Sequence, residues 1–118
     1  MCIRDSCNGK LNEIKINWND KKSICVVLCS KGYPETYQKN IEIKNINKIE
    51  LNTLDHLFHA GTIKRGDVTL AAGGRVLNFV SLSDSFEESR NRIHQLLNNL
   101  NWSDGFFRKD IGYKVIKK

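Results

Sequence analysis

The stretch that decides the fold runs from residue 75 to residue 100 and reads RVLNFVSLSDSFEESRNRIHQLLNNL. Its first part, Arg75–Leu82, follows two glycines and is typical of a strand. A regular strand would place Arg75, Leu77, Phe79 and Ser81 on one face and Val76, Asn78, Val80 and Leu82 on the other. From Asp84 to about Asn99 the apolar spacing becomes that of an amphipathic helix. The sequence therefore predicts a strand followed directly by one long helix.

The predicted helix has a start signal and an apolar stripe. Asp84 followed by Glu87 is a capping-box pattern, with Asp84 as the N-cap. Glu88 and Arg92 have the spacing of an i,i+4 ion pair on the solvent side. The stripe consists of Phe86, Ile93, Leu96, Leu97 and Leu100. We expect this stripe to pack on a sheet.

Several strands are predicted before this unit. Glu13–Trp18 alternates and Ile24–Cys29 is uninterruptedly apolar, so the two predict a hairpin whose second strand is covered on both faces. Shorter strands are expected at Ile41–Lys44 and Leu54–His59, and Val68–Ala71 should follow a tight turn at residues 64–67. After the helix, Gly105 is expected to begin an extended tail over residues 106–116. The predicted class is α+β, a small antiparallel sheet or partial barrel with one long helix.

Composition limits the function classes. The chain has 118 residues with 19 Lys+Arg and 13 Asp+Glu, a formal net charge of +6. This length suits one domain, and the longest apolar run, Ile24–Cys29, is far below the ~18–20 residues of a membrane span. The cations are scattered, which favours a solvated surface over a nucleic-acid patch. A stand-alone basic module that binds RNA or protein remains the alternative, with Phe106–Lys109 as the one place where aromatic residues adjoin cations.

The cysteines and the first residues carry no site of their own. Cys2, Cys7, Cys25 and Cys29 lack the spacing of a zinc or redox motif, so we expect small buried hydrophobic residues in a reducing cytoplasm and no metal site. Residues 1–6, MCIRDS, fit no predicted element and look like translated sequencing-adapter or cloning-derived sequence. We therefore divide the chain into residues 1–6 and one domain over residues 7–118.

No self-contained active site is found. His56 and His59 should point to opposite faces of their strand, and His94 has no carboxylate at helical reach. Four clusters do combine glycine with polar residues beside apolar strands, namely Cys29–Pro34, Phe58–Thr62, Ala72–Asn78 and Phe106–Gly112. Each cluster alone could be only a tight turn or a bulge.

In this order, the clusters resemble the C-terminal domain of the glycinamide ribonucleotide synthetase (phosphoribosylamine–glycine ligase) family. That pattern is a strand ending in Gly-Tyr-Pro, then Phe-His-Ala-Gly-Thr, then Gly-Gly-Arg-Val-Leu, and last Arg-Lys-Asp-Ile-Gly, and this chain supplies it over Cys7–Ile116. The resemblance implies an ATP-grasp ligase of de novo purine biosynthesis, the IMP pathway. Such a ligase joins glycine to 5-phosphoribosylamine through glycyl phosphate, using ATP and Mg²⁺ or Mn²⁺.

The resemblance also implies how this chain relates to that enzyme. It looks like a cytoplasmic C-terminal fragment that is inactive alone and holds neither ATP nor metal, with no nucleic-acid or membrane partner. Its partners would be the ATP-grasp and N-terminal domains, which supply those ligands. The implied fold is the rudiment single hybrid motif of the biotin carboxylase C-terminal domain, which closes one side of the substrate cleft. The equivalent domain of another ATP-grasp ligase or carboxylase is a nearer alternative than an RNA-binding module.

One residue is the main candidate for contact with substrate. Arg75, presented by Gly73 and Gly74, is expected to face the cleft and hold an anionic group, since a planar guanidinium suits phosphate or carboxylate. The alternative is that Arg75 pairs with Asp110 or with a carbonyl group and fixes the sheet.

The remaining candidates are weaker. His59 and Thr62 are candidates for the same cleft, although His59 could instead anchor a turn through a hydrogen bond to the backbone. Arg108 and Asp110 are expected on one strand face as structural ion-pair residues. No catalytic residue is expected in this chain.

Overall fold

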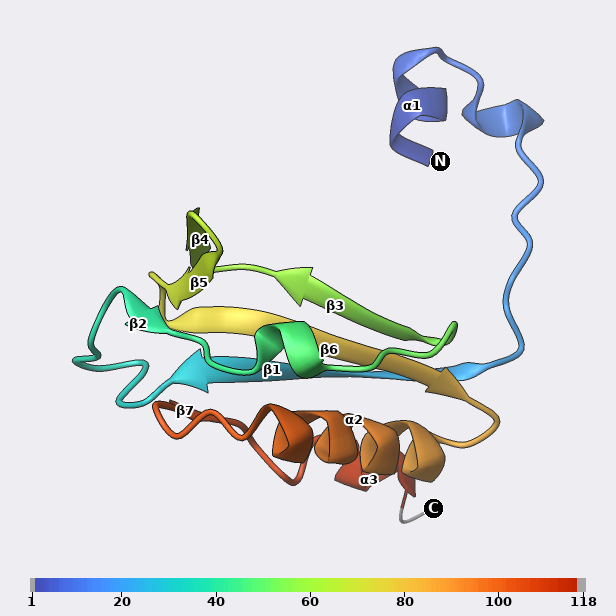
Figure 1. Ribbon diagram of the computed structural model, residues 1–118. Helices are drawn as coiled ribbons and strands as arrows, with labels where there is room; N and C mark the ends of the chain where they lie inside the picture. The colour runs from blue at the N-terminus through green and yellow to red at the C-terminus, as the bar shows by residue number, and fades with distance from the viewer. Residues whose placement is uncertain (1, 117–118) are drawn as a thin grey trace.

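The computed structural model describes residues 2–116 as an α+β fold with two antiparallel sheets and one long helix, as predicted (Figure 1). The strands are β1 (Lys22–Ser30), β2 (Ile41–Glu42), β3 (Asp55–His59), β4 (Thr62–Arg65), β5 (Val68–Ala71), β6 (Arg75–Ser83) and β7 (Gly105–Phe106). The helices are α1 (Cys2–Cys7), α2 (Phe86–Leu100) and α3 (Tyr113–Ile116), with short 3-10 turns η1 (Leu11–Glu13) and η2 (Ile46–Lys48). One sheet has the strand order β3-β6-β1-β7, and the other has the order β2-β5-β4.

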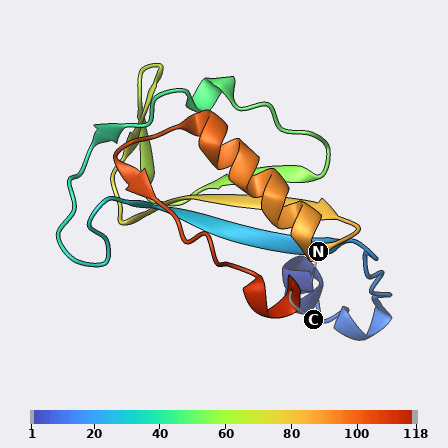
Figure 2. The ribbon, with the colours of Figure 1, turned by 90° about the horizontal axis from the view of Figure 1, so that it is seen from below.

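The pair β1–β6 forms the middle of the larger sheet. The two strands run antiparallel from the pair Lys22–Ser83 to the pair Leu28–Leu77. α2 lies across both strands on one side of the sheet (Figure 2). The strand and helix predicted from residues 75–100 are thus confirmed, and they lie side by side because the chain reverses directly after β6.

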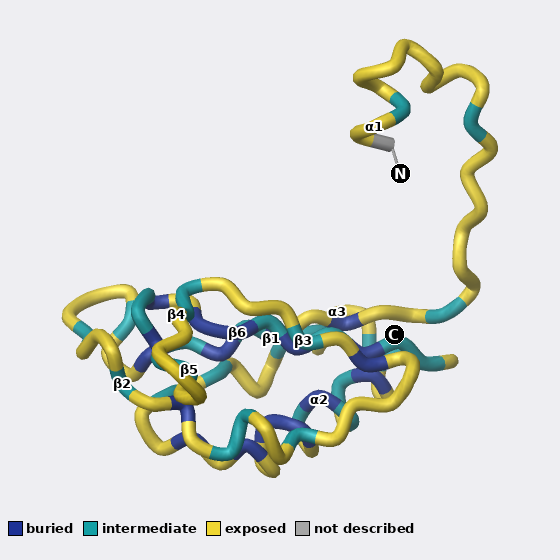
Figure 3. Tube along the Cα trace, turned by 45° about the horizontal axis from the view of Figure 1, so that its top comes forward, coloured by how far each residue is buried: buried dark blue, intermediate teal, exposed yellow. Residues whose placement is uncertain are grey.

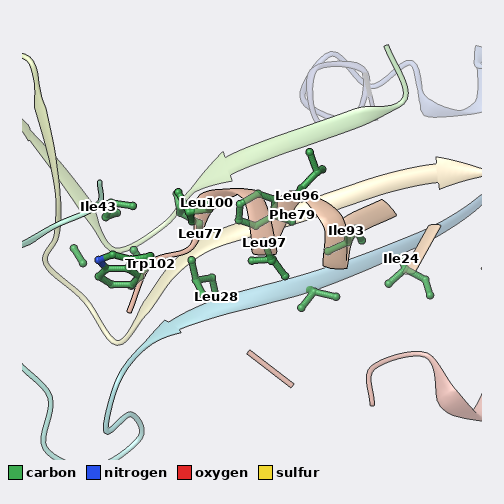
Figure 4. Close-up of a cluster of buried hydrophobic side chains, with 13 residues drawn as sticks. Ile24, Leu28, Ile43, Leu77, Phe79, Ile93, Leu96, Leu97, Leu100 and Trp102 are labelled. Carbon is green, nitrogen blue, oxygen red and sulfur yellow. The ribbon is translucent and has the colours of Figure 1, made fainter. Parts of the chain in front are cut away.

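The hydrophobic core lies between this sheet and α2 (Figure 4). Its buried side chains include Ile24, Val26 and Leu28 from β1, Val76, Leu77 and Phe79 from β6, and Ile93, Leu96, Leu97 and Leu100 from α2. The predicted helical stripe is therefore buried, with Phe86 at its margin. Trp102 extends the core toward the smaller sheet, where its indole Nε1 donates a hydrogen bond to the Glu42 carbonyl oxygen at 2.9 Å.

The start of α2 differs from the prediction by one residue. Ser85, and not Asp84, is the N-cap, because Ser85 has the extended backbone of a cap and its Oγ accepts a hydrogen bond from the Glu88 amide at 3.1 Å. Asp84 instead accepts a hydrogen bond from the Lys21 ammonium at 2.6 Å. The helix ends at Asn101, whose left-handed backbone (φ 45°) is a common C-terminal stop.

The predicted ion pair between Glu88 and Arg92 is wrong. Arg92 instead donates through Nε to Oδ2 of the buried Asp55 carboxylate at 2.8 Å, and its Nη2 lies 2.8 Å from the same oxygen as an ion pair. The same carboxylate accepts from the Ser81 hydroxyl at 2.8 Å and from the Asn52 amide at 3.1 Å. Burial alone would raise the pKa of Asp55, but these hydrogen bonds hold it below its usual value. This network joins β3, β6 and α2.

The predicted strand at Glu13–Trp18 is also wrong. The segment begins in η1 and continues as an extended arm, in which Ile16 is 61% exposed and Trp18 is 86% exposed. An alternating pattern becomes a strand only beside a partner strand. Residues 14–20 pair with no described strand, although β7 covers only Cys29 and Ser30 on the edge of β1 that faces away from β6. Residues 2–6, which fitted no predicted element, form the short helix α1 together with Cys7 (Figure 1).

Most of the extended tail predicted over residues 106–116 is wrong as well. β7 is only Gly105–Phe106, and the chain ends its described part in α3. Ile24 lies against the backbone of Gly112, just before α3. By contrast, the strand predicted at Leu54–His59 is confirmed as β3, and the tight turn at residues 64–67 is confirmed by the β4–β5 hairpin.

Burial alternates along β1, so the two faces of this strand are not equally covered. Figure 3 shows that buried residues are concentrated in the sheet and α2, whereas the N-terminal arm is mostly exposed. Ile24, Val26 and Leu28 point toward α2 and are buried, whereas Cys25 is exposed and Cys29 is half-buried. The prediction that both faces of this strand are covered, and that these two cysteines are buried, is therefore wrong. The side of the larger sheet that points away from α2 is called the open face here, and it is represented by Cys25, Val27, Phe58, Val80 and Phe106.

Candidate functional site

The four sequence clusters meet at the end of β1. Cys29 pairs with Arg75 of β6 on one side and with Phe106 of β7 on the other. The next residue, Ser30, donates its amide to the Gly74 carbonyl and its hydroxyl to the Gly73 carbonyl, both at 2.8 Å. We call this region the loop junction and define it as residues 29–34, 59–62, 72–75 and 105–108.

At the loop junction two backbones cross at Gly61 and Gly73. The Gly61 amide donates to the Arg75 carbonyl at 2.8 Å, and the Gly61 carbonyl accepts from the amides of Ala72 and Gly73 at 2.8 and 3.0 Å. A Cβ atom at Gly61 would lie 2.6 Å from the Arg75 carbonyl oxygen. Glycine is therefore required here by the approach of the backbone itself.

Gly74 is buried against an aromatic ring. A Cβ atom at this position would overlap the ring of Tyr33, from the Gly-Tyr-Pro cluster. Tyr33 was not a candidate from the sequence, although its place in that cluster was the signal that could have identified it. Gly73 and Gly74 thus pack against other parts of this chain, Gly61 and Tyr33. These contacts hold the backbone in place where β6 begins.

Arg75 lies on the opposite face from the one that strict alternation predicts. The pairing shifts from Leu28–Leu77 to Cys29–Arg75, so β6 has one extra residue, Val76, at this point. Val76 and Leu77 are both fully buried (0% exposed), as expected when a β-bulge turns two consecutive side chains inward. The bulge places Arg75 on the open face, beside Cys29.

Among residues 2–116 no hydrogen bond or ion pair is found for the exposed Arg75 guanidinium. The suggested partner, Asp110, is bonded instead to Arg108, through Nε at 3.0 Å and Nη2 at 2.6 Å. The Arg108 guanidinium lowers the pKa of Asp110, and that carboxylate raises the pKa of Arg108. These two residues pair with each other in an irregular segment, which leaves Arg75 available for a ligand.

An apolar groove adjoins this arginine. It has a volume of about 400 Å³ and lies between the open face and the segment after β7. Its lining includes Val27, Cys29, Tyr33 and Phe106. Burial raises the pKa of the Cys29 thiol, and Arg75 opposes this change. The groove therefore combines an apolar floor with one nearby unpaired cation.

His59 and Thr62 belong to the loop junction but do not share a surface with Arg75. The His59 Nδ1 and the Thr62 Oγ1 are 2.9 Å apart and share a hydrogen bond across the turn between β3 and β4. Both line a separate hollow of about 720 Å³, together with Leu57 and Lys64. Since His59 pairs with Leu77, it belongs to the face opposite Arg75. The structure thus brings His59 and Thr62 together, and Arg75 together with Gly73–Gly74, but it does not join the two sets.

The described residues do not fit a metal-bound cofactor. Residues 2–116 contain no group of three or more His, Cys, Asp or Glu side chains placed to hold a metal ion. No helix in that range is long and apolar enough to cross a membrane.

Comparison with known proteins gives one consistent result. The family model described as "Phosphoribosylglycinamide synthetase, C domain" matches residues 23–114. The chain is 31% identical over 116 residues to a phosphoribosylamine–glycine ligase of Brucella melitensis, covering 98% of this chain and 27% of that relative. It is 36% identical over 116 residues to an Arabidopsis thaliana enzyme of the same name, described as chloroplastic, covering 96% of this chain and 22% of that relative. The chain thus spans about a quarter of the length of these relatives.

A solved structure shares the fold. The crystal structure of phosphoribosylamine–glycine ligase from Thermotoga maritima matches with a TM-score of 0.69 at 23% sequence identity. The match covers 93% of this chain and 27% of that one. The arrangement of sheets and helix described above is therefore also found within a larger ligase.

Proposed function

This chain belongs to the phosphoribosylglycinamide synthetase C-domain family, and we propose that it is the C-terminal domain of a phosphoribosylamine–glycine ligase. The family resemblance predicted from the four clusters is confirmed. The match over residues 23–114 carries the proposal, because it includes all four clusters that meet at the loop junction. The proposed enzyme joins glycine to 5-phosphoribosylamine with ATP in purine biosynthesis. These matches give no support to an RNA-binding module or to a different ATP-grasp enzyme.

The proposed reaction uses ATP and a divalent metal ion. We propose that ATP and Mg²⁺ or Mn²⁺ are held by the ATP-grasp and N-terminal domains of the same polypeptide. When bound, ATP supplies the phosphate that activates the glycine carboxylate. The cytoplasmic location remains a prediction, and the plant relative is described as chloroplastic.

Within this domain, Arg75 is the residue proposed to meet an anionic substrate. Three observations support this role: the guanidinium is exposed, it has no partner among residues 2–116, and the bulge at Val76 fixes its direction. A planar guanidinium can form two parallel hydrogen bonds with a phosphate or a carboxylate. For His59 and Thr62, their mutual hydrogen bond supports a role in fixing the turn between β3 and β4.

The proposed activity is tested on the complete protein that contains this chain. We expect glycine-dependent and 5-phosphoribosylamine-dependent release of ADP, and no such release from the chain alone. Absence of ligase activity in a folded complete protein would contradict the proposal. Activity of the chain alone would contradict its assignment as a domain without catalytic residues.

The role of Arg75 is tested by Arg75→Ala in the complete enzyme. We expect KM for one anionic substrate to rise by about tenfold or more. This corresponds to the loss of one charge-assisted hydrogen bond, which contributes ~1.5–3 kcal/mol to binding. Arg75→Lys should recover part of this loss, because Lys keeps the charge but not the fork. Arg65→Ala, at an exposed arginine in the β4–β5 hairpin, is the matched control and should change nothing. Unchanged kinetic constants in Arg75→Ala would exclude the role.

A further inference from the structure

The strand register aligns side chains in rows across the open face. One row is His56 of β3, Val80 of β6 and Cys25 of β1, and the next is Phe58, Asn78 and Val27. Residues paired across antiparallel strands project to the same side of a sheet. The open face is therefore a continuous surface over three strands, and the loop junction lies at its end.

This surface does not have the composition of a solvated sheet face. In an antiparallel sheet with one wet side, the positions that point outward are normally polar. Here Phe58 is 55% exposed and Phe106 is 40% exposed, and both lie on the same side as the exposed Cys25. The two rings lie on the edge strands β3 and β7, with Asn78 and Val27 between them, and exposed apolar side chains of this kind mark interaction surfaces.

We propose that the open face is the docking surface for the rest of the ligase polypeptide, an inference that rests on the proposed function. The relatives carry this domain as about a quarter of their length, so a much larger part of the same polypeptide is available to cover it. α2 already closes the other face of the sheet. The open face is thus the side of the sheet on which further chain can pack without displacing the core.

Two further features favour this occupant. The arm that leads into β1 also carries exposed apolar side chains, Ile16 and Trp18. At the far end of the open face, Arg75 has no partner among residues 2–116. The docked surface should therefore be apolar at its centre, with an acidic side chain or an anionic substrate near Arg75.

A second copy of this chain fits the open face less well. Each copy carries a formal net charge of +6, and like charges oppose self-association. A partner from elsewhere in the same polypeptide also needs no separate association step, because it is held at high effective concentration. These points favour an intramolecular interface.

Cys25 provides a built-in reporter for this interface. Its thiol is exposed in this structure and lies in the first row of the open face. The experiment is maleimide labelling of the complete native enzyme, with the labelled cysteine assigned by mass spectrometry. Asn91→Cys, at an exposed position on the solvent side of α2, is the matched control. The same preparation is assayed for ligase activity.

We expect Cys25 in the complete enzyme to react at least about tenfold more slowly than Asn91→Cys, because labelling would require the domains to separate. Phe58→Asp should remove this protection while Asn91→Asp leaves it intact. Comparable labelling of Cys25 and Asn91→Cys in an active ligase would overturn the interface and leave the proposed function standing. Concentration-dependent protection of Cys25 in the chain alone would assign the surface to a second copy and would also overturn it. Loss of the proposed function itself would appear separately, as a folded protein without ligase activity.

Discussion

The two faces of the larger sheet are formed by the same strands but are covered differently. Phe79 of β6 is completely buried under α2, whereas Phe58, on the neighbouring strand β3, is 55% exposed on the open face. Both are phenylalanines in strand interiors, so residue type does not explain the difference. The core lies where another element of the chain covers the sheet, and exposed apolar residues on the other face indicate a partner.

The charged groups differ in the same way. On the helix side, the Asp55 carboxylate is buried and receives hydrogen bonds from Arg92 and Ser81. On the open face, Arg75 is exposed and no partner for it lies within residues 2–116. A buried charge needs a partner because burial removes it from water, whereas an exposed charge is solvated and can remain unpaired until a ligand binds. We therefore expect Asp55 to contribute to stability and propose that Arg75 contributes to substrate binding.

The largest expected effect separates the two phenylalanines. Phe79→Ala should lower the free energy of unfolding of the chain by about 3–5 kcal/mol, because it leaves a cavity under α2. Phe58→Ala should lower it by about 1 kcal/mol or less, since its side chain is largely exposed. Urea unfolding followed by circular dichroism measures both. Equal losses in the free energy of unfolding would contradict this difference, because they would show that Phe58 is packed as tightly as Phe79.

The next effect concerns the buried carboxylate. Asp55→Asn should cost about 2–3 kcal/mol, because it leaves Arg92 without its charged partner. Asp84→Asn removes an exposed ion pair with Lys21 and should change stability by about 0.5 kcal/mol at most. The comparison uses the same urea titration, and a similar cost for the two variants would contradict the structural role of Asp55.

The same carboxylate predicts acid sensitivity. The pKa of Asp55 is lower in the folded chain than in the unfolded chain. The ionised carboxylate therefore makes its full contribution to the free energy of unfolding at any pH above the pKa of Asp55 in the unfolded chain. That contribution is lost as the pH falls through the pKa of Asp55 in the folded chain. In the wild-type chain the free energy of unfolding should fall more steeply below about pH 4 than in Asp55→Asn. Parallel curves for the two proteins would contradict this linkage.

A smaller effect is expected from His94 on α2. No partner for its Nε2 is found among residues 2–116, and its ring lies 5.5 Å from that of Phe107. Burial lowers the pKa of His94, and the nearby Arg90 and Lys109 lower it further. Protonation of His94 should therefore loosen the segment after β7. The free energy of unfolding should be highest above about pH 6.5, the pKa of an unperturbed histidine, and should decrease as the pH falls below it. The urea midpoint at pH 5.5 and 7.5 tests this, and His94→Leu should remove the difference.

The sequence predicted the central unit well because its signals are local. The apolar stripe of α2 and the tight turn between β4 and β5 need only a few neighbouring residues to be recognised. The N-cap was misplaced by one residue because Asp84 and Ser85 are both good caps, and only the backbone decides between them. The four clusters were informative because their order along the chain is itself a long pattern.

The errors arose where distant residues decide. The bulge at Val76 depends on how β6 pairs with β1, and it reverses the direction of Arg75. Trp18 has a strand-like neighbourhood, but the segment that carries it pairs with no described strand. Arg92 pairs with Asp55, which is distant in sequence, and not with the nearby Glu88. The reason is that a cation interacts more strongly with a buried carboxylate than with an exposed one. None of these outcomes can be read from local spacing.

The most direct test of the difference between the two faces is Phe58→Asp, measured both in the chain alone and in the complete ligase. We expect the urea midpoint of the chain alone to stay nearly unchanged, while the ligase activity of the complete enzyme falls by about tenfold or more, as when an aromatic residue central to an interface is lost. Asn91→Asp on α2 should affect neither measurement. Full ligase activity in Phe58→Asp would contradict the account, because it would show that the open face has no partner in the working enzyme.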